Sequence, residues 1–280
     1  FSLDWCHVPL LSNITPALRR SLVAALRPGL IVVDDAAADP TSLADLADSG
    51  DAAADTPVLA LSDLLAEPSP APPGTPSRRP EDVAPSALTD LGINRIMWSS
   101  GSSGAPKPIV WRQDKLLRER QRWNHAIGVS QSDIYFCRHP LEVAHATDLH
   151  LFSSLLAGAT LVLDDVGLDA PQVANLVRQR QVTVMSWLPD HYTELCNVLR
   201  GRGPRPLPHL RLAMCGGSKL DTATVDEFVA LTGVTIREVY GSTEFGLAMI
   251  SAPGGPGRQP LQLVTGVEAE LQPLQPLGPG

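Results

Sequence analysis

Residues 160–187 read TLVLDDVGLDAPQVANLVRQRQVTVMSW, and this stretch decides the fold class. It opens with an apolar run at 160–163, continues with a helix expected at 171–179, and ends with a second apolar run at 182–186. Proline at the first turn of a helix loses no hydrogen bond, because the N–H that it lacks has no partner there. A strand, a helix and a second strand of these lengths predict a unit with parallel strands.

The same alternation continues on both sides of this unit. The pattern predicts strands at 30–33, 93–98, 109–111, 210–215 and 235–239, and helices at 16–26, 114–127, 146–157, 190–199 and 222–231. Asp114 is the expected N-cap of its helix, and 267–271 shows a short strand-like alternation. Strands that alternate with helices predict an α/β protein: layered αβα subdomains with largely parallel sheets.

Composition shifts divide the chain into four predicted parts. Residues 1–67 read as a first, incomplete α/β subdomain, and 68–90 as a surface linker, because seven prolines fall between 68 and 85. Residues 91–250 form the expected nucleotide- and acyl-binding α/β subdomain. The Pro/Gly-rich tail at 251–280 holds the start of a further strand region.

Charge and hydropathy exclude several classes of partner. The 280 residues carry a net charge of −8 and no long run of Lys or Arg, so neither nucleic acid nor a membrane surface is an expected partner. No apolar stretch approaches the roughly 20 residues that span a bilayer, and no secretory leader is evident at the start. The expectation is a soluble, cytoplasmic protein.

The cysteines indicate neither a disulfide framework nor a zinc site. All four are scattered, without a C-x-x-C pair: Cys6, Cys137, Cys196 and Cys215. We expect them to be small buried side chains.

A hydroxyl-rich loop follows the strand expected at 93–98. It reads Ser99-Ser100-Gly101-Ser102-Ser103-Gly104-Ala105-Pro106-Lys107-Pro108. Successive N–H groups in such a turn form an anion-binding concavity, and Lys107 adds a point charge suited to a polyphosphate. The spacing G-x-x-x-x-G-K-[ST] of a Walker loop is absent.

Two further motifs follow predicted strands. Cys215-Gly216-Gly217-Ser218 closes the strand at 210–215, and Tyr240-Gly241-Ser242-Thr243-Glu244 follows the strand at 235–239. Ligands bind at the carboxyl ends of strands in open α/β sheets. In order and separation, the three motifs resemble those of the adenylate-forming (AMP-binding) superfamily, which includes acyl-CoA synthetases, aryl-acid ligases and peptide-synthetase adenylation domains.

The resemblance implies a fold, a reaction and a set of residue roles. The fold is that of the large N-terminal domain of these enzymes, truncated at both ends. The reaction is activation of a carboxylic acid by ATP to an acyl-adenylate, with Mg²⁺, and transfer to CoA or to the phosphopantetheine thiol of a carrier protein. Lys107 and the loop Ser99–Gly104 would hold the β and γ phosphates, Thr243 the α-phosphate, and Glu244 the metal. Gly216, Gly217, Ser218, Tyr240 and Gly241 would contact the nucleotide.

The resemblance also places an acid pocket. His145 stands where adenylation domains for α-amino acids usually present an aspartate, which favours an aryl or acyl acid without an α-amino group. The other expected pocket residues are Trp187, Gly241, Leu247 and Ala248. Two alternatives remain at this point: His139, His145 and His150 as ordinary histidines at helix ends, and Trp187 as a core aromatic.

Parts of the family pattern have no match here. Relatives continue to a ribose-binding aspartate and to a small C-terminal domain whose lysine completes the adenylation site. A catalytically impaired domain that binds a ligand or partner without full turnover is therefore an alternative to the ligase. An unrelated α/β NTPase, in which the Ser/Gly loop is a coincidence, is a second one.

Overall fold

The structure, a computed structural model, describes Val8 and residues 31–33, 58–60, 92–99, 107–163, 167–203 and 205–270. The helix expected at 16–26, the linker at 68–90, the loop at 100–106 and residues 271–280 lie outside these ranges, as does Cys6. The chain divides into two units, residues 1–96 and 97–280. Within the first unit, β1 (Ile31–Val33) confirms the strand expected at 30–33 and pairs in parallel with β2 (Val58–Ala60).

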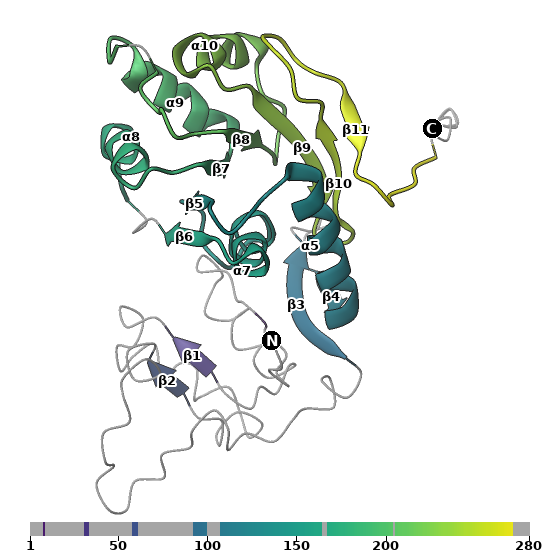
Figure 1. The fold of residues 1–280 in the computed structure, drawn as a ribbon. Helices are drawn as coiled ribbons and strands as arrows, with labels where there is room; N and C mark the ends of the chain where they lie inside the picture. The colour runs from purple at the N-terminus through teal and green to yellow at the C-terminus, as the bar shows by residue number, and fades with distance from the viewer. Residues whose placement is uncertain are drawn as a thin grey trace, which may run out of the picture. The chain divides into compact units, whose positions relative to one another are not determined.

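The second unit is built on a seven-stranded sheet with the order β11-β10-β9-β8-β7-β5-β6 (Figure 1). Five neighbouring strands run parallel: β6 (Thr160–Leu163), β5 (Ile134–Cys137), β7 (Val184–Trp187), β8 (Leu212–Cys215) and β9 (Ile236–Ser242). β10 (Gly246–Ser251) and β11 (Leu261–Leu263) continue the sheet in antiparallel pairing. The sheet is thus largely parallel, as predicted.

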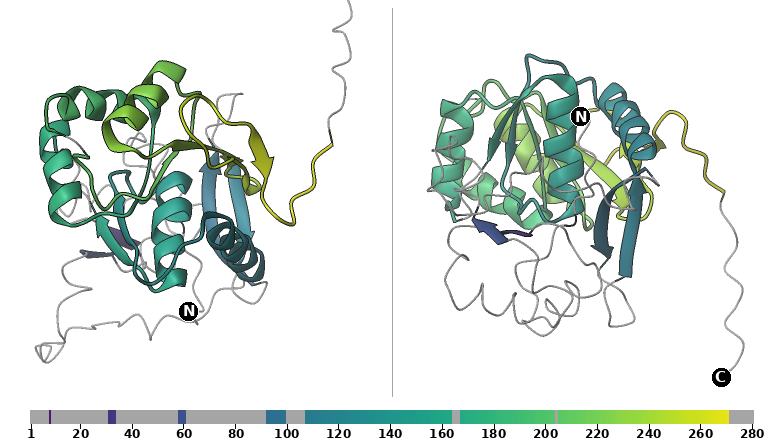
Figure 2. Two further views of the ribbon diagram at one scale, coloured as in Figure 1. Left: turned by 45° about the horizontal axis from the view of Figure 1, so that its top comes forward. Right: turned by 90° about the horizontal axis from the view of Figure 1, so that it is seen from below.

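Helices cover both faces of this sheet (Figures 1 and 2). On one face, α8 (Ala170–Gln179), α9 (Pro189–Leu199) and α10 (Thr222–Thr232) enclose one hydrophobic core. On the other, α5 (Gln113–Ile127) encloses a second core. Strand residues alternate between the two cores, as in β8, where Ala213 and Cys215 join the first and Leu212 and Met214 the second. The predicted αβα layering is confirmed.

Three predictions about individual elements are wrong: an N-cap, the type of one helix and a strand near the end. The helix at 113–127 has Arg112 rather than Asp114 at its N-cap position, and Asp114 lies in the first turn, where it pairs with Arg112 and Arg118. The helix expected at 146–157 consists of α6 (Ala144–Ala146), the π-helix η3 (Thr147–Leu151) and α7 (Phe152–Ala157). No strand occupies 267–270, because the Val267 amide donates to the Val264 carbonyl in a turn.

Two strands form a separate sheet before α5. β3 (Ile93–Ser99) and β4 (Lys107–Arg112) pair with each other and flank the hydroxyl-rich loop. The three described cysteines, Cys137, Cys196 and Cys215, are buried, as expected. Among the residues that the structure describes, no helix combines the length and the apolar character needed to cross a membrane.

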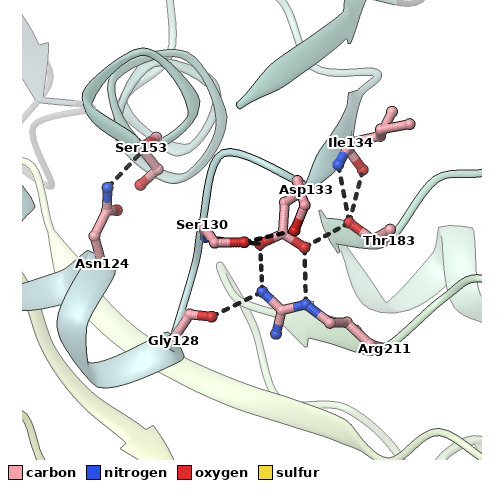
Figure 3. A network of polar contacts seen from close by, with 9 residues as sticks. Asn124, Gly128, Ser130, Asp133, Ile134, Ser153, Thr183 and Arg211 are labelled. Carbon is pink, nitrogen blue, oxygen red and sulfur yellow. Dashed lines mark hydrogen bonds and ion pairs between the residues drawn. The ribbon is translucent and has the colours of Figure 1, made fainter. Parts of the chain in front are cut away.

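A buried carboxylate locks the edge of the sheet where the parallel strands begin (Figure 3). Asp133 accepts hydrogen bonds from Arg211 Nε (2.8 Å) and Nη2 (2.6 Å), from the Ser130 amide (2.8 Å) and from the Thr183 hydroxyl (2.7 Å). The Arg211 guanidinium also donates to the carbonyl of Gly128. Burial opposes ionisation, but these donors hold the pKa of Asp133 at about 2. The network joins the residues that precede β5, β7 and β8.

Replacement of Asp133 by asparagine is expected to reduce the free energy of unfolding by about 2 kcal/mol near pH 7, since one pKa unit corresponds to about 1.4 kcal/mol. The folded pKa lies below the unfolded value, so this stabilisation is complete above pH 4 and disappears as pH falls through 2. Urea unfolding of both proteins at pH 7 and pH 2.5 measures it. Asp114→Asn, at an exposed pair, is the matched control. An equal difference at both pH values would contradict the assignment.

Candidate active site

The candidate site lies where the parallel strands end. Four segments follow consecutive strands of the sheet order: residues 138–145 after β5, 188–191 after β7, 216–218 after β8, and the turn after β9. Carboxyl ends of parallel strands share one edge of a sheet, so these segments converge there. The motifs at 215–218 and 240–244 and the histidine expected in the acid pocket belong to this set, whereas the hydroxyl-rich loop follows β3 of the separate two-stranded sheet.

The Tyr-Gly-Ser-Thr-Glu motif is a hairpin rather than a loop after a strand. β9 continues through Tyr240 and Gly241 to Ser242, so the predicted strand end at 239 is wrong. The strand runs on because β10 offers it a partner, with Gly241 opposite Leu247. Ser242–Gly246 therefore form a tight turn, which the indole N–H of Trp111 in β4 fastens by donating to the Thr243 carbonyl at 2.8 Å.

The hairpin leaves no room for a side chain at Gly241. A Cβ on Gly241 would lie 2.3 Å from the carbonyl oxygen of Gly246, which no real Cβ contact allows. Leu247 flanks the same position, and the Ala248 carbonyl accepts from the Val264 amide at 2.9 Å. The two residues expected as pocket walls thus belong to the second strand of the hairpin.

Charges of opposite sign meet at the turn. Glu244 is exposed, and its pKa is lowered first by the hydroxyl of Ser242, then by its own backbone amide and by the positive charge of Lys107. Lys107 is the first residue of β4 and is also exposed. The positive charge of Lys107 thus acts on Glu244, although the two residues stand 137 positions apart in the sequence. Ser99 ends β3, whereas Ser100, Gly101, Ser102, Ser103 and Gly104 lie outside the described residues.

Large exposed side chains border the turn. The Tyr240 ring is 55% exposed and lies 6.1 Å, centroid to centroid, from that of Phe245, which is 48% exposed. After β8, the Gly216 amide donates to the Trp187 carbonyl, and Gly217 adopts a left-handed φ of +85° before the exposed Ser218. These positions follow β8 and β9, which are neighbours in the sheet.

His145 belongs to a cluster of imidazoles on the same edge. Its Nε2 lies 3.1 Å from both the carbonyl oxygen and the hydroxyl of Ser186 in β7, and His139 Nε2 lies 3.2 Å from the same carbonyl. The ring centroids of His139 and His145 are 4.6 Å apart, and those of His150 and His191 lie within 6 Å of His139. A Cβ on Gly216 would lie 3.5 Å from His145 Cε1.

These imidazoles are neutral near pH 7. Burial lowers the pKa of His139 to about 3 and that of His145 to about 4, and it lowers the pKa of His150 and His191 as well. Mutual repulsion between the rings adds to the effect for His139 and His150. His150 is fully buried and neither of its ring nitrogens has a hydrogen-bond partner. The cluster offers neutral donors and acceptors rather than positive charge.

Trp187 lies in the hydrophobic core. Its ring is fully buried; it packs edge-on against Phe136 at a centroid distance of 5.8 Å and lies tilted against Tyr192 at 5.6 Å. The ring reaches the histidine cluster only through His191, 6.3 Å away. Trp187 therefore packs against the histidine cluster at His191 as part of the core, which fits the core interpretation that the sequence left open.

Comparison with known protein families decides the classification. A model of the AMP-binding enzyme family matches residues 1–271. The chain belongs to this family. Its described fold and the order of its motifs are those of an AMP-binding enzyme, as the sequence resemblance predicted.

Curated relatives within the AMP-binding family are only distantly similar. The chain is 31% identical over 173 residues to tyrocidine synthase 3 of Brevibacillus parabrevis, which covers 60% of this chain and 3% of that protein. It is 28% identical over 228 residues to a 4-hydroxybenzoate–CoA/benzoate–CoA ligase of Rhodopseudomonas palustris, which covers 81% of this chain and 40% of the ligase.

Solved structures of AMP-binding relatives share the fold. ATP-bound MatB from Rhodopseudomonas palustris superposes with a TM-score of 0.69 at 21% identity, over 91% of this chain and 50% of MatB. VinN in complex with L-aspartate gives a TM-score of 0.67 at 24% identity, over 88% of this chain and 59% of VinN. The chain thus spans about half the length of these solved relatives.

Sequence reasoning missed most of the histidine cluster. It named His139 and His150 only within the alternative of ordinary helix-end histidines, which it left open, and it did not single out His191. The position of His139 depends on β5, which the sequence pattern did not reveal, and that of His150 depends on a π-helix. One indication was available: His191 follows a predicted buried strand by only a few residues, which places it at the ligand-binding edge.

We expect Gly241→Ala to break the hairpin, because the added Cβ would meet the Gly246 carbonyl oxygen at 2.3 Å. The expected loss is about 1–3 kcal/mol of unfolding free energy, as for other overpacked sites. Urea unfolding measures it. Gly255→Ala is the control, because no atom lies within 4 Å of the Cβ built there. Equal stability of the two variants would show that the hairpin relaxes around a side chain.

Acidification is expected to destabilise the chain through the histidine cluster. Between about pH 6.5 and 4, His139 and His145 bind protons in the unfolded chain but not in the folded one. The free energy of unfolding therefore falls as pH falls through this range. His139→Gln should reduce the loss between pH 7 and pH 5 by about 2 kcal/mol. Urea unfolding at both pH values, with exposed His209→Gln as control, measures the difference. An unchanged loss in His139→Gln would refute the neutral cluster.

Proposed function

We propose that this chain activates a carboxylic acid with ATP, forming an acyl-adenylate and pyrophosphate for transfer to CoA or to a carrier-protein thiol. The observation that carries the proposal is the hydrogen bond from Trp111 to the Thr243 carbonyl, which ties β4, the strand that begins with Lys107, to the turn that holds Thr243 and Glu244. The names of two relatives support this reaction, because one is a 4-hydroxybenzoate–CoA/benzoate–CoA ligase and the other is tyrocidine synthase 3. The structure of MatB with bound ATP supports ATP as the nucleotide of the proposed reaction.

The residues at the turn suit a triphosphate and its metal. Lys107, with Ser99 and the loop Ser100–Gly104, would hold the β and γ phosphates, and Thr243 the α-phosphate. The described residues contain no group of three or more acidic, His or Cys side chains arranged for a metal. A lone exposed carboxylate such as Glu244 nevertheless fits Mg²⁺, which binds through one or two carboxylates when phosphates supply further ligands. When bound, Mg²⁺ would neutralise charge on the phosphates of ATP while the adenylyl group is transferred to the acid and pyrophosphate leaves.

The remaining nucleotide contacts follow from position. Tyr240 offers an exposed ring for an adenine to stack upon, and Gly241 keeps the backbone beneath it free of side chains. Gly216, Gly217 and Ser218 would line the neighbouring side after β8. None of these groups reacts; they position the nucleotide.

The chemistry asks the protein for alignment and charge compensation. A carboxylate oxygen of the acid forms a bond to the α-phosphorus while the bond to pyrophosphate breaks, so no proton transfer is required. Alignment of nucleophile and leaving group lowers the barrier by converting a bimolecular step into an intramolecular one. Lys107 would compensate the charge that grows on the departing pyrophosphate. CoA or a phosphopantetheine thiol would then take the acyl group in a second step.

The acid pocket favours an aryl or acyl acid without an α-amino group. His145 stands where an ammonium would need an anion, and burial keeps this imidazole neutral. The neutral His145 ring supplies no negative charge to an ammonium, and an ammonium buried beside it would depend on the nearby carboxylate of Asp148 as its partner. Gly241, Leu247 and Ala248 would form the hairpin wall of the pocket, with Trp187 as the support behind His191.

The test is carboxylate-dependent exchange of pyrophosphate into ATP with Mg²⁺, over a panel of benzoate, 4-hydroxybenzoate, malonate and L-aspartate. We expect exchange with a member that lacks an α-amino group, and a drop of about 100-fold or more in both Glu244→Gln and Lys107→Ala, as for other electrostatic groups at transition states. Glu227→Gln, on α10, is the matched charge control.

Each of the other outcomes supports a different interpretation of this chain. Wild-type exchange in both variants would remove the site assignment. Binding of an acyl-adenylate analogue without exchange would indicate the catalytically impaired alternative. ATP hydrolysis that ignores the acid would indicate an NTPase.

A further inference from the structure

Helix α5 turns two charged residues toward the protein interior. Its buried stripe consists of Leu116, Glu119, Arg120, Trp123 and Ile127. Glu119 is 4% exposed and Arg120 is fully buried, although such positions on an amphipathic helix ordinarily carry apolar side chains. Buried charges cost free energy unless they are paired and hydrogen bonded, so what these two residues contact matters.

Glu119 holds the candidate nucleotide turn. Its Oε1 accepts from the Leu247 amide at 2.8 Å, immediately after Gly246 at the end of the turn. Gly246 has a left-handed φ of +77°, and a Cβ there would lie 2.6 Å from the same carboxylate oxygen. The turn that carries Thr243 and Glu244 therefore packs directly against the Glu119 carboxylate.

Arg120 holds the helix of the histidine cluster. Its guanidinium pairs with Glu119 Oε2, and its Nη1 donates to the Asp148 carbonyl at 2.7 Å. The Ser153 hydroxyl donates to that carbonyl too, at 3.0 Å. Asp148 lies inside η3, where the Phe152 amide bonds to the Thr147 carbonyl five residues earlier. Arg120 and Ser153 thus satisfy a carbonyl within the π-helical turn.

The π-helical turn determines where the histidines point. In a regular α-helix of about 3.6 residues per turn, residues five apart face roughly 140° away from each other. His145 and His150 are five apart, yet their ring centroids lie only 5.8 Å apart. The wider turn of η3 brings both rings to one side, and π-helical turns are often found at functional sites.

We propose that Glu119 and Arg120 are positioning residues that hold the nucleotide turn and the acid-pocket histidines in one fixed arrangement. The chain of contacts runs from the Leu247 amide through the two side chains to the Asp148 carbonyl. The catalytic meaning of this connection rests on the proposed function, whereas the connection itself does not. Neither residue contacts the reacting groups; both act through segments that do.

Two double variants separate the contact of Glu119 with the turn, here called the turn arm, from the contact of Arg120 with Asp148, here called the histidine arm. Glu119→Gln with Arg120→Met keeps an acceptor for the Leu247 amide but removes the donor to Asp148. Glu119→Met with Arg120→Met removes both. Neither variant leaves an unpaired buried charge, since both partners become neutral. The control is Arg200→Met with Glu227→Met, which neutralises an exposed bidentate pair between α9 and α10.

The readouts do not depend on enzyme activity. Modification of His150 by diethyl pyrocarbonate, followed by mass spectrometry, reports on the histidine arm; hydrogen exchange of residues 242–248 reports on the turn. In the full chain we expect His150 labelling to rise at least fivefold in both double variants. We expect turn exchange to accelerate about tenfold only in Glu119→Met/Arg120→Met, and the affinity for MgATP to fall with it. The control should match the wild type.

A folded double variant with protected His150 would overturn the histidine arm, and unchanged exchange at 242–248 in Glu119→Met/Arg120→Met would overturn the turn arm. If the double variants fail to fold, Arg120→Lys and Gly246→Ala replace them. Lysine keeps the charge but lacks the guanidinium fork, so His150 should become labelled; an alanine Cβ pushes the turn off Glu119, so only the turn should exchange faster. A wild type without acid-dependent exchange would refute the proposed function alone.

Discussion

The parallel hydrogen-bond ladder from β6 through β5, β7 and β8 to β9 is the constraint on which the rest of the structure depends. Its register sets Trp187 opposite Cys215 and Cys215 opposite Glu238, so the segments after β7 and β8 emerge at one level, whereas β9 runs on from Glu238 to Ser242 before its turn. At the opposite edge, Asp133 and Arg211 tie the starts of the strands together. Site geometry is therefore fixed from both ends of the same strands.

Local pattern was enough to predict the elements at 160–239, where apolar strands and amphipathic helices alternate and Asp169 caps α8 through a capping box with Gln172. It was not enough for β5 and β10. β5 has four residues and no period, and its identity as a strand comes from pairing with β6 and β7. β10 follows a tight turn and gains its extended form from β9, which lies beside it. Pairing with neighbouring strands, distant in sequence for β5 and across a hairpin for β10, decided both.

The same distinction divides the site. Motifs that lie within a few consecutive residues, such as Tyr240–Glu244, can be found in the sequence by their resemblance to the family, and the nucleotide-binding role of this motif stays a prediction. The histidine cluster could not, because its members come from three segments and its packing depends on a π-helix. The charged pair at 119 and 120 was equally hidden: on an isolated helix such residues read as solvated, and only the contacts with Leu247 and Asp148 give them a role.

The two halves of the site solve opposite electrostatic problems. Under the proposed function, a triphosphate brings several negative charges to the exposed side chains of Lys107 and Glu244, where water screens what the protein does not compensate. The apolar part of the proposed acid brings none, and the histidine rings proposed to face it are buried and neutral. A buried ion pair between these halves transmits position without adding net charge to either, because the charges of Glu119 and Arg120 cancel. An apolar pair in its place would fill the space but leave the Leu247 amide and the Asp148 carbonyl without these partners.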